Sequence, residues 1–267
     1  MSEDQPVSVT TTVAVPSRSL GDAMAARLRE LSIVVVGCGI AGALVGGLGS
    51  RLAMRLAALA APEVQGALTE NGNVVGEITF QGTIALMIVA GLSSTVFGAG
   101  AFVVMRPWLP RRTVPRGLVL GGFLLALFGT AVVDAGNADF AILGDRLLNI
   151  TMFSALFVAF GLVASSAFVV LERRVPPAVS LSPRLWALTA VCALPVVPGV
   201  IGVAFAFGSN LGLPLIGAWL AMLAASAVDR RGRHRLAQLI RVGATTAMLV
   251  VVGLAGAEYV DSVTTML

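Results

Sequence analysis

Long apolar stretches recur along the chain, and arginines, prolines or other polar residues separate them. Seven of these stretches hold about twenty residues, enough for an α-helix to cross the hydrocarbon core of a bilayer, which is about 30 Å thick. The predicted spans are 31–49, 82–105, 117–136, 150–171, 185–207, 211–228 and 242–260. This pattern predicts an all-α polytopic membrane protein with seven transmembrane helices.

Two polar segments precede the first span. Residues 1–19 are rich in Ser, Thr, Pro and Val, a composition typical of a disordered tail. Residues 20–30 are expected to form a short polar helix that runs into the first span. The apolar run that follows is longer than the core of a cleavable signal peptide, about 7–15 residues, so we expect a permanent helix. The chain therefore divides into a tail, 1–19, and a seven-helix membrane domain, 20–267.

Composition and charge support a membrane location and predict an orientation. Only 12% of the residues are charged, against about 25% in soluble domains, and every basic side chain is an arginine. If the N-terminus is cytoplasmic, fifteen of the eighteen arginines fall in cytoplasmic segments, and only Arg51, Arg55 and Arg146 lie outside. Because basic residues concentrate on the cytoplasmic side, we expect an N-in, C-out protein with a cytoplasmic tail. Arginine without lysine fits a GC-rich genome, so the expected location is the bacterial cytoplasmic (inner) membrane.

Two of the three outer arginines directly follow the first span. Arg51 and Arg55 lie one helical turn apart, at or just beyond the outer boundary of the membrane. At about 100° per residue they share the side of the helix that holds Ile33 and Ile40. We expect these two guanidinium groups either to bind an anion or to reach lipid head groups.

Small residues form a separate face on the same helix. This face consists of Gly39, Gly42, Ala43, Gly46 and Ser50. The GxxxG spacing occurs within it at 42–46 and again at 117–121, and this spacing is typical of close contacts between membrane helices.

The longest segment between spans, 62–81, joins the first two helices on the outer side. Apolar and polar residues alternate on both sides of Asn71-Gly72, a dipeptide typical of two-residue hairpin turns. We therefore predict an outer β-hairpin. Its acids, Glu70 and Glu77, belong either to a lid or docking surface or to a simple cap over the helix ends.

The second outer loop offers further oxygen ligands. Asp134 and Asp139 lie near Asn137, but their spacing does not match the calcium-binding loop pattern. We expect no metal site and no cofactor. The two cysteines, Cys38 and Cys192, lie inside apolar runs and are expected to be buried small hydrophobic residues.

The middle of each predicted span is free of Asp, Glu, Arg and His, which argues against a proton relay, a voltage sensor or an aspartyl protease. The polar groups at mid-depth are neutral. The candidate substrate-binding residues are Ser93, Ser94, Thr95, Pro195, Pro198 and Gly199. The two prolines would free backbone carbonyls in the fifth span, either as part of a binding site or as a packing kink.

Sequence motifs of catalysis are absent. A serine nucleophile at Ser93 would need a base, and the only histidine, His234, lies in the basic cytoplasmic segment 230–241. No zinc-ligand or phosphate-binding motif occurs. A short basic segment between spans is typical of a topological anchor, so we expect no nucleic-acid binding. The protein is expected not to be an enzyme.

These observations favour one function and leave two alternatives. The favoured function is handling or transport of a small neutral or amphiphilic solute, or a lipid, through an uncharged polar seam in the membrane. The first alternative is a structural or accessory subunit that binds a protein partner, or a second copy of itself, through glycine-faced helices and the outer loop. The second is an outer-face enzyme that uses acids such as Asp134 and Asp145. Membrane lipids are the expected partners in every case.

Overall fold

The computed structural model describes residues 20–62, 66, 79–133, 145–177, 183–206 and 208–267. Within these ranges the chain is helical and has no strand. Seven helical stretches of the described chain are long and apolar enough to cross a membrane, and they coincide with the seven predicted spans. The chain is therefore a multi-pass helical membrane protein. The predicted tail, 1–19, and the core of the predicted hairpin, 67–78, lie outside the described residues.

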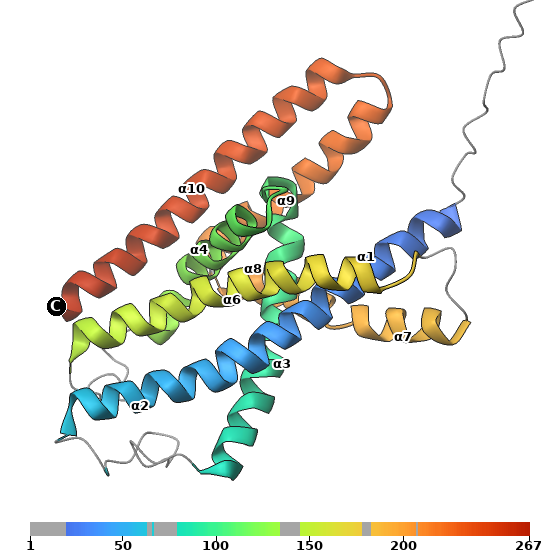
Figure 1. Cartoon of the computed structure of the whole chain (residues 1–267). Coiled ribbons are helices and arrows are strands. Elements are labelled where there is room, and N and C mark those ends of the chain that lie inside the picture. The colour runs from blue at the N-terminus through green and yellow to red at the C-terminus, as the bar shows by residue number, and fades with distance from the viewer. Residues whose placement is uncertain (1–19, 63–65, 67–78, 134–144, 178–182, 207) are drawn as a thin grey trace, which may run out of the picture.

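Figure 1 shows the order of the helices along the chain. The first span comprises α1, η1 and α2, and the second comprises α3 and η3; α4 and α6 are the third and fourth, α7 with α8 the fifth, and α9 and α10 the last two. Their bounds are α1 Leu20–Ala41, η1 Gly42–Gly49, α2 Ser50–Ala60, α3 Phe80–Met105, η3 Arg106–Trp108, α4 Thr113–Val132, α6 Arg146–Arg174, α7 Pro183–Ala193, α8 Val196–Ala206, α9 Gly208–Arg230 and α10 His234–Met266.

The first span is longer than its apolar run requires. As predicted, a polar segment runs into it without a break, and the helix continues past the two outer arginines to Ala60. Its middle part, η1, is a π-helix, which the sequence pattern did not predict. A π-helix bonds each residue to the fifth residue along instead of the fourth, so it changes the rotation of everything that follows.

Local polar groups set several helix ends. The Thr79 side chain accepts a hydrogen bond from the Gly82 backbone N–H at 3.1 Å, and Asp145 does the same for Leu148 at 3.1 Å. Both are N-caps, which satisfy amide groups that a first turn leaves unpaired. Thr79 and Phe80 fall within the segment predicted to form the hairpin, but in the structure they begin α3. Gly232, with φ of +77°, makes the tight turn between α9 and α10.

The seven spans pack around a common core. α1 lies between α3 and α6, α4 between α6 and α10, and α9 between α8 and α10, while α8 packs on α3 and α7 on α1. The central cluster includes Val104, Leu120, Phe168, Val203 and Leu215, none more than 2% exposed. It therefore joins side chains from the first four spans to side chains from the last three.

The two ends of the bundle differ in charge. At one end of the bundle, α1, α4 and α10 begin and α3, α6 and α9 end. We call it the arginine-rich end, because it holds Arg29, Arg106, Arg116, Arg173 and Arg230. At the opposite end α2, α4 and α10 finish and α3 and α6 start.

Candidate functional site

The first four spans enclose a cavity of about 450 Å³, which we call the apolar cavity. Its wall comes from η1, the first residue of α2, α3, α4 and α6. The lining residues are Val45, Gly46, Ser50, Ser93, Ser94, Phe97, Gly98, Leu124, Phe128, Val132, Phe153, Leu156, Phe157 and Phe160. Val132 is the last residue of α4, and Ser50 and Phe153 lie in the halves of their helices opposite the arginine-rich end, so the cavity occupies that half of the bundle.

The wall of the apolar cavity is mostly hydrocarbon. Five of its residues are phenylalanines, and no charged side chain is among the lining residues. The rings of Phe97 and Phe128 meet edge to face, with centroids 5.2 Å apart, where α3 approaches α4. Hydroxyl groups come from Ser50, Ser93 and Ser94, and that of Ser50 donates to the Gly46 carbonyl of its own helix. The site thus suits an apolar guest with few polar groups.

The course of α3 explains why the bundle is hollow there. None of its residues from Phe80 to Phe97 is buried, whereas seven of the eight from Gly98 to Met105 are. In Figure 1 the Phe80 end of α3 extends away from α4 and α6. The two helices meet at Phe97 and Phe128 and diverge toward the start of α3.

Glycines close the opposite wall by bringing η1 against α3. A Cβ at Gly42 would lie 2.7 Å from Cβ of Ser94, and one at Gly47 would lie 2.6 Å from the Met87 side chain. The predicted small-residue face of the first span therefore packs inside the chain. The second GxxxG pair does the same on the other side: a Cβ at Gly117 or at Gly121 would lie 2.7 Å from the backbone of α6.

The three neutral polar residues of the second span have different surroundings. Ser93 and Ser94 line the apolar cavity, and Ser94 also contacts the glycine face of η1. Thr95 donates its hydroxyl proton to the Gly91 carbonyl at 2.6 Å and faces Gly39 on α1. The structure thus brings two of the three into one site.

The broken fifth span lies away from this site. Helix α7 ends at Ala193 and α8 begins at Val196, so the interruption falls at Leu194 and Pro195, where the sequence predicted a break. Pro198 is exposed and lies in the first turn of α8, where the missing N–H needs no partner. Gly199 packs against the backbone of α3 near Gly100. None of these residues lines the apolar cavity.

The outer arginines lie beyond η1. Arg51 is half-buried against the first turn of α3, where a side chain at Gly82 would collide with its guanidinium group. Its Nε–H is buried and has no hydrogen-bond partner among the described residues. Arg55 is half-buried. The π-helix intervenes between Ile33 and these residues, so a rotation of 100° per residue does not place them.

Four of the acids predicted on the outer side belong to the two outer loops. Glu70, Glu77, Asp134 and Asp139 lie outside the described residues.

No protein-family model, curated protein or solved structure that was compared with the chain matches it. Its function must therefore be inferred from the site itself.

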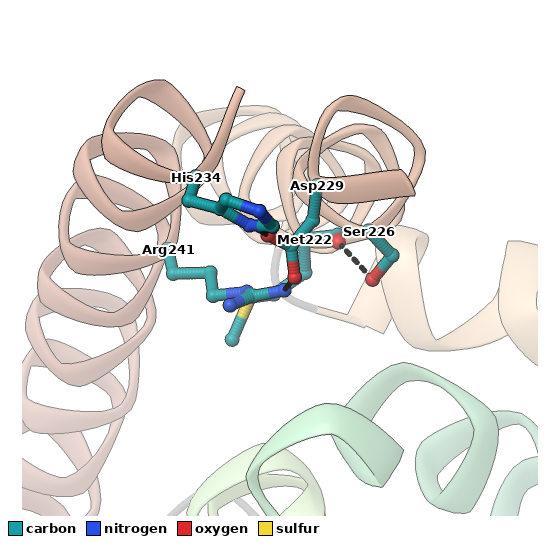
Figure 2. A network of polar contacts seen from close by, with 5 residues as sticks. All are labelled: Met222, Ser226, Asp229, His234 and Arg241. Atoms are coloured by element: carbon teal, nitrogen blue, oxygen red, sulfur yellow. Dashed lines mark hydrogen bonds and ion pairs between the residues drawn. The ribbon is translucent and has the colours of Figure 1, made fainter. Parts of the chain in front are cut away.

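The only histidine is part of a polar network at the arginine-rich end, shown in Figure 2. His234 Nδ1 lies 2.6 Å from one carboxylate oxygen of Asp229, and Arg241 donates to the other at 2.7 Å. These contacts fasten α9 to α10 across their turn. His234 is thus engaged far from Ser93, as the sequence predicted. Among the described residues no group of three or more His, Cys, Asp and Glu lies close enough to hold a metal ion.

Sequence reasoning missed most of the cavity wall. Its phenylalanines come from three different spans, and each lies in a continuous apolar run. In such a run a residue that faces a cavity cannot be told from one that faces lipid. The one signal available was the pair of serines at mid-depth.

Proposed function

We propose that this membrane protein binds an amphiphilic or neutral apolar molecule, such as a lipid or a small solute, in the apolar cavity of its first four spans. The observation behind the proposal is the cavity itself. Its volume of about 450 Å³ falls within the range of small-molecule sites, about 300–1,000 Å³.

The lining chemistry supports a particular kind of ligand. A charged group in this cavity would lose its hydration without gaining a partner of opposite charge, whereas an alkyl chain or an aromatic ring would contact five phenylalanine rings. The hydroxyls of Ser93 and Ser94 supply a place for one neutral polar group. We place the route of entry from the surrounding lipid between α3 and α4, which diverge beyond the Phe97–Phe128 contact.

Handling of such a molecule, including its transport, is better supported than an accessory role. The accessory role was predicted from glycine-faced helices, and those faces at Gly42, Gly46, Gly117 and Gly121 already pack against helices of the same chain. The proposal assigns no catalytic residue.

We further propose that the arginine-rich end is cytoplasmic and that the protein resides in a bacterial inner membrane. Fifteen of eighteen arginines would then lie on the cytoplasmic side, in agreement with the usual distribution of basic residues. The apolar cavity would lie in the outer half of the bilayer. A reporter enzyme that works only outside the cytoplasm, fused to the C-terminus, tests this orientation. We expect the fusion to be active.

The binding proposal is tested with cis-parinaric acid, a fatty acid whose chain fluoresces when it enters a dry site and whose carboxylate would remain in water outside the cavity. Ser93→Phe places a ring into the cavity from an exposed position of α3. We expect its affinity to be about tenfold weaker than that of the wild type, because about two buried methylene groups of the ligand are displaced.

Ser166→Phe is the matched control, since Ser166 is exposed on α6 and does not line the cavity. It should bind like the wild type. Equal binding by Ser93→Phe and Ser166→Phe would contradict the proposal. With binding shown, flux of the same ligand across liposomes that contain the protein distinguishes transport from binding alone.

A further inference from the structure

A second cavity, of about 190 Å³, lies at the arginine-rich end of the same four spans, and we call it the arginine cavity. Helices α1, α3, α4 and α6 and the α3–α4 connection supply its wall. Its charged lining residues are Arg29, Glu30, Arg106, Arg111, Arg116 and Glu172. Four guanidinium groups and two carboxylates thus surround it.

Two of the four arginines hold helix ends together. Arg29 donates to the carbonyls of Glu172, Val175 and Pro176, at 2.6–2.9 Å, and so completes the C-terminal end of α6. Arg106 forms an ion pair with Glu30, and Arg27 binds the same carboxylate at 3.1 Å. The charge of Glu30 is therefore already balanced by two cations.

The other two arginines keep donors that the protein does not use. Arg116 donates from Nη2 to the Ser165 carbonyl at 3.0 Å, and its guanidinium lies 5.7 Å from the centre of the Phe168 ring. Its Nε–H is buried and has no hydrogen-bond partner among the described residues. Arg111 makes no hydrogen bond or ion pair within the described part of the chain.

Nε of Arg116 is covered by protein, so a ligand in the cavity would reach Arg116 through its Nη groups, of which only Nη2 has a hydrogen-bond partner in the described part of the chain. A second guanidinium, that of Arg111, lines the same cavity without a hydrogen bond or ion pair among the described residues. Glu172 is exposed at this site, so water screens its charge. The unmet hydrogen-bonding capacity at this cavity is therefore cationic.

We propose that the arginine cavity binds a phosphate-type anion between Arg111 and Arg116. Phosphate oxygens match the planar, forked geometry of guanidinium groups and form charge-assisted hydrogen bonds with them. The same chemistry is offered by free inorganic phosphate and by the phosphodiester of an anionic lipid head group.

The adjacent residues Arg111 and Arg112 provide a matched pair for the test. Both are exposed and carry the same charge, but only Arg111 lines the cavity. Because Arg111 has no hydrogen bond or ion pair among the described residues to lose, Arg111→Gln should fold like the wild type. Arg112→Gln changes the net charge by the same amount and controls for nonspecific attraction.

The first arm titrates inorganic phosphate against the full chain in lipid-free detergent, with ionic strength held constant by sodium chloride and thermal unfolding as the signal. The second arm reconstitutes the chain in nanodiscs of phosphatidylcholine with phosphatidylglycerol and counts retained phosphatidylglycerol by native mass spectrometry. Response in the first arm identifies free phosphate as a ligand, and response in the second arm alone identifies the lipid head group.

In whichever arm responds, Arg111→Gln should weaken binding at least about tenfold, the effect of losing one charge-assisted hydrogen bond, and Arg112→Gln should stay within about twofold of the wild type. Glu172→Gln should strengthen binding, because it removes the opposing carboxylate. The proposal is overturned if neither arm shows binding, or if the two arginine variants lose binding equally.

Discussion

The apolar cavity and the arginine cavity are built by the same four spans, yet their chemistry is opposite. The first is the larger, about 450 Å³, and has no charged residue in its wall; the second is about 190 Å³ and is lined by four arginines and two glutamates. Between them α4 and α6 remain in contact through Gly117, Gly121 and Gly161. Depth in the membrane therefore decides the chemistry of each site, because charged groups are tolerated near the helix ends and are costly at the centre.

The comparison also shows two ways of leaving space in a helical bundle. The apolar cavity exists because α3 diverges from α4 beyond the Phe97–Phe128 contact. The arginine cavity exists because long side chains from several helix ends face one another and cannot fill the space between them. The first kind of space suits an apolar guest, and the second suits an anion.

The largest expected effect is a difference in the free energy of unfolding between substitutions in the packed core and substitutions in the wall of the apolar cavity. Leu120 is fully buried, whereas Leu156 lines the apolar cavity. Leu120→Ala should lower the free energy of unfolding by about 2–5 kcal/mol, and Leu156→Ala by less than about 2 kcal/mol, since fewer neighbouring atoms lose contact. Reversible unfolding in mixed micelles measures both values. Equal losses would mean that the cavity is as well packed as the core.

The next effect concerns the close contact between α4 and α6, the two helices that contribute to both cavities. A Cβ at Gly121 would lie 2.7 Å from the Phe157 carbonyl oxygen on α6, while one at Gly122 would meet nothing within 4 Å. Gly121→Ala should therefore cost about 1–3 kcal/mol of stability and weaken both binding reactions. Gly122→Ala should be neutral or slightly stabilising, because alanine favours a helix. If both variants behaved alike in the unfolding assay, the close α4–α6 contact would be refuted.

The smallest effect lies outside both cavities. Asp229 joins His234 and Arg241 at the turn between α9 and α10, and both contacts are near the surface (Figure 2). Asp229→Asn should loosen this turn, seen as faster hydrogen exchange at residues 229–234, because it removes the charge that pairs with Arg241. Fatty-acid and phosphate binding should not change. A loss of either would show that the last three spans influence the cavities.

The sequence predicted the spans well because the bilayer imposes a simple rule. A helix must hold about twenty apolar residues, and that requirement can be counted along the chain. Ser93 and Ser94 could be singled out because a hydroxyl in an apolar run is conspicuous. The break at Pro195 was also predictable, since proline cannot continue a helix hydrogen-bond pattern.

The parts that escaped prediction depend on how helices pack. Phe157 lines a cavity and Phe205 is 79% exposed, yet each lies in an equally apolar stretch. The arginine cavity combines residues from separate helix ends, so Arg29 and Arg116 show no relation in the sequence. The π-helix η1 also altered the expected rotation of Arg51, which regular helical spacing could not anticipate.

The most direct test of the central claim, that the apolar cavity holds an apolar ligand, is photo-cross-linking with a palmitic acid that bears a diazirine in its chain. The full chain is irradiated in liposomes, and the labelled peptides are identified by mass spectrometry. We predict labels concentrated on Phe128 and on residues 153–160, with competition by unlabelled palmitic acid. Labels spread evenly over lipid-facing positions such as Leu239 and Leu249, without competition, would contradict the claim.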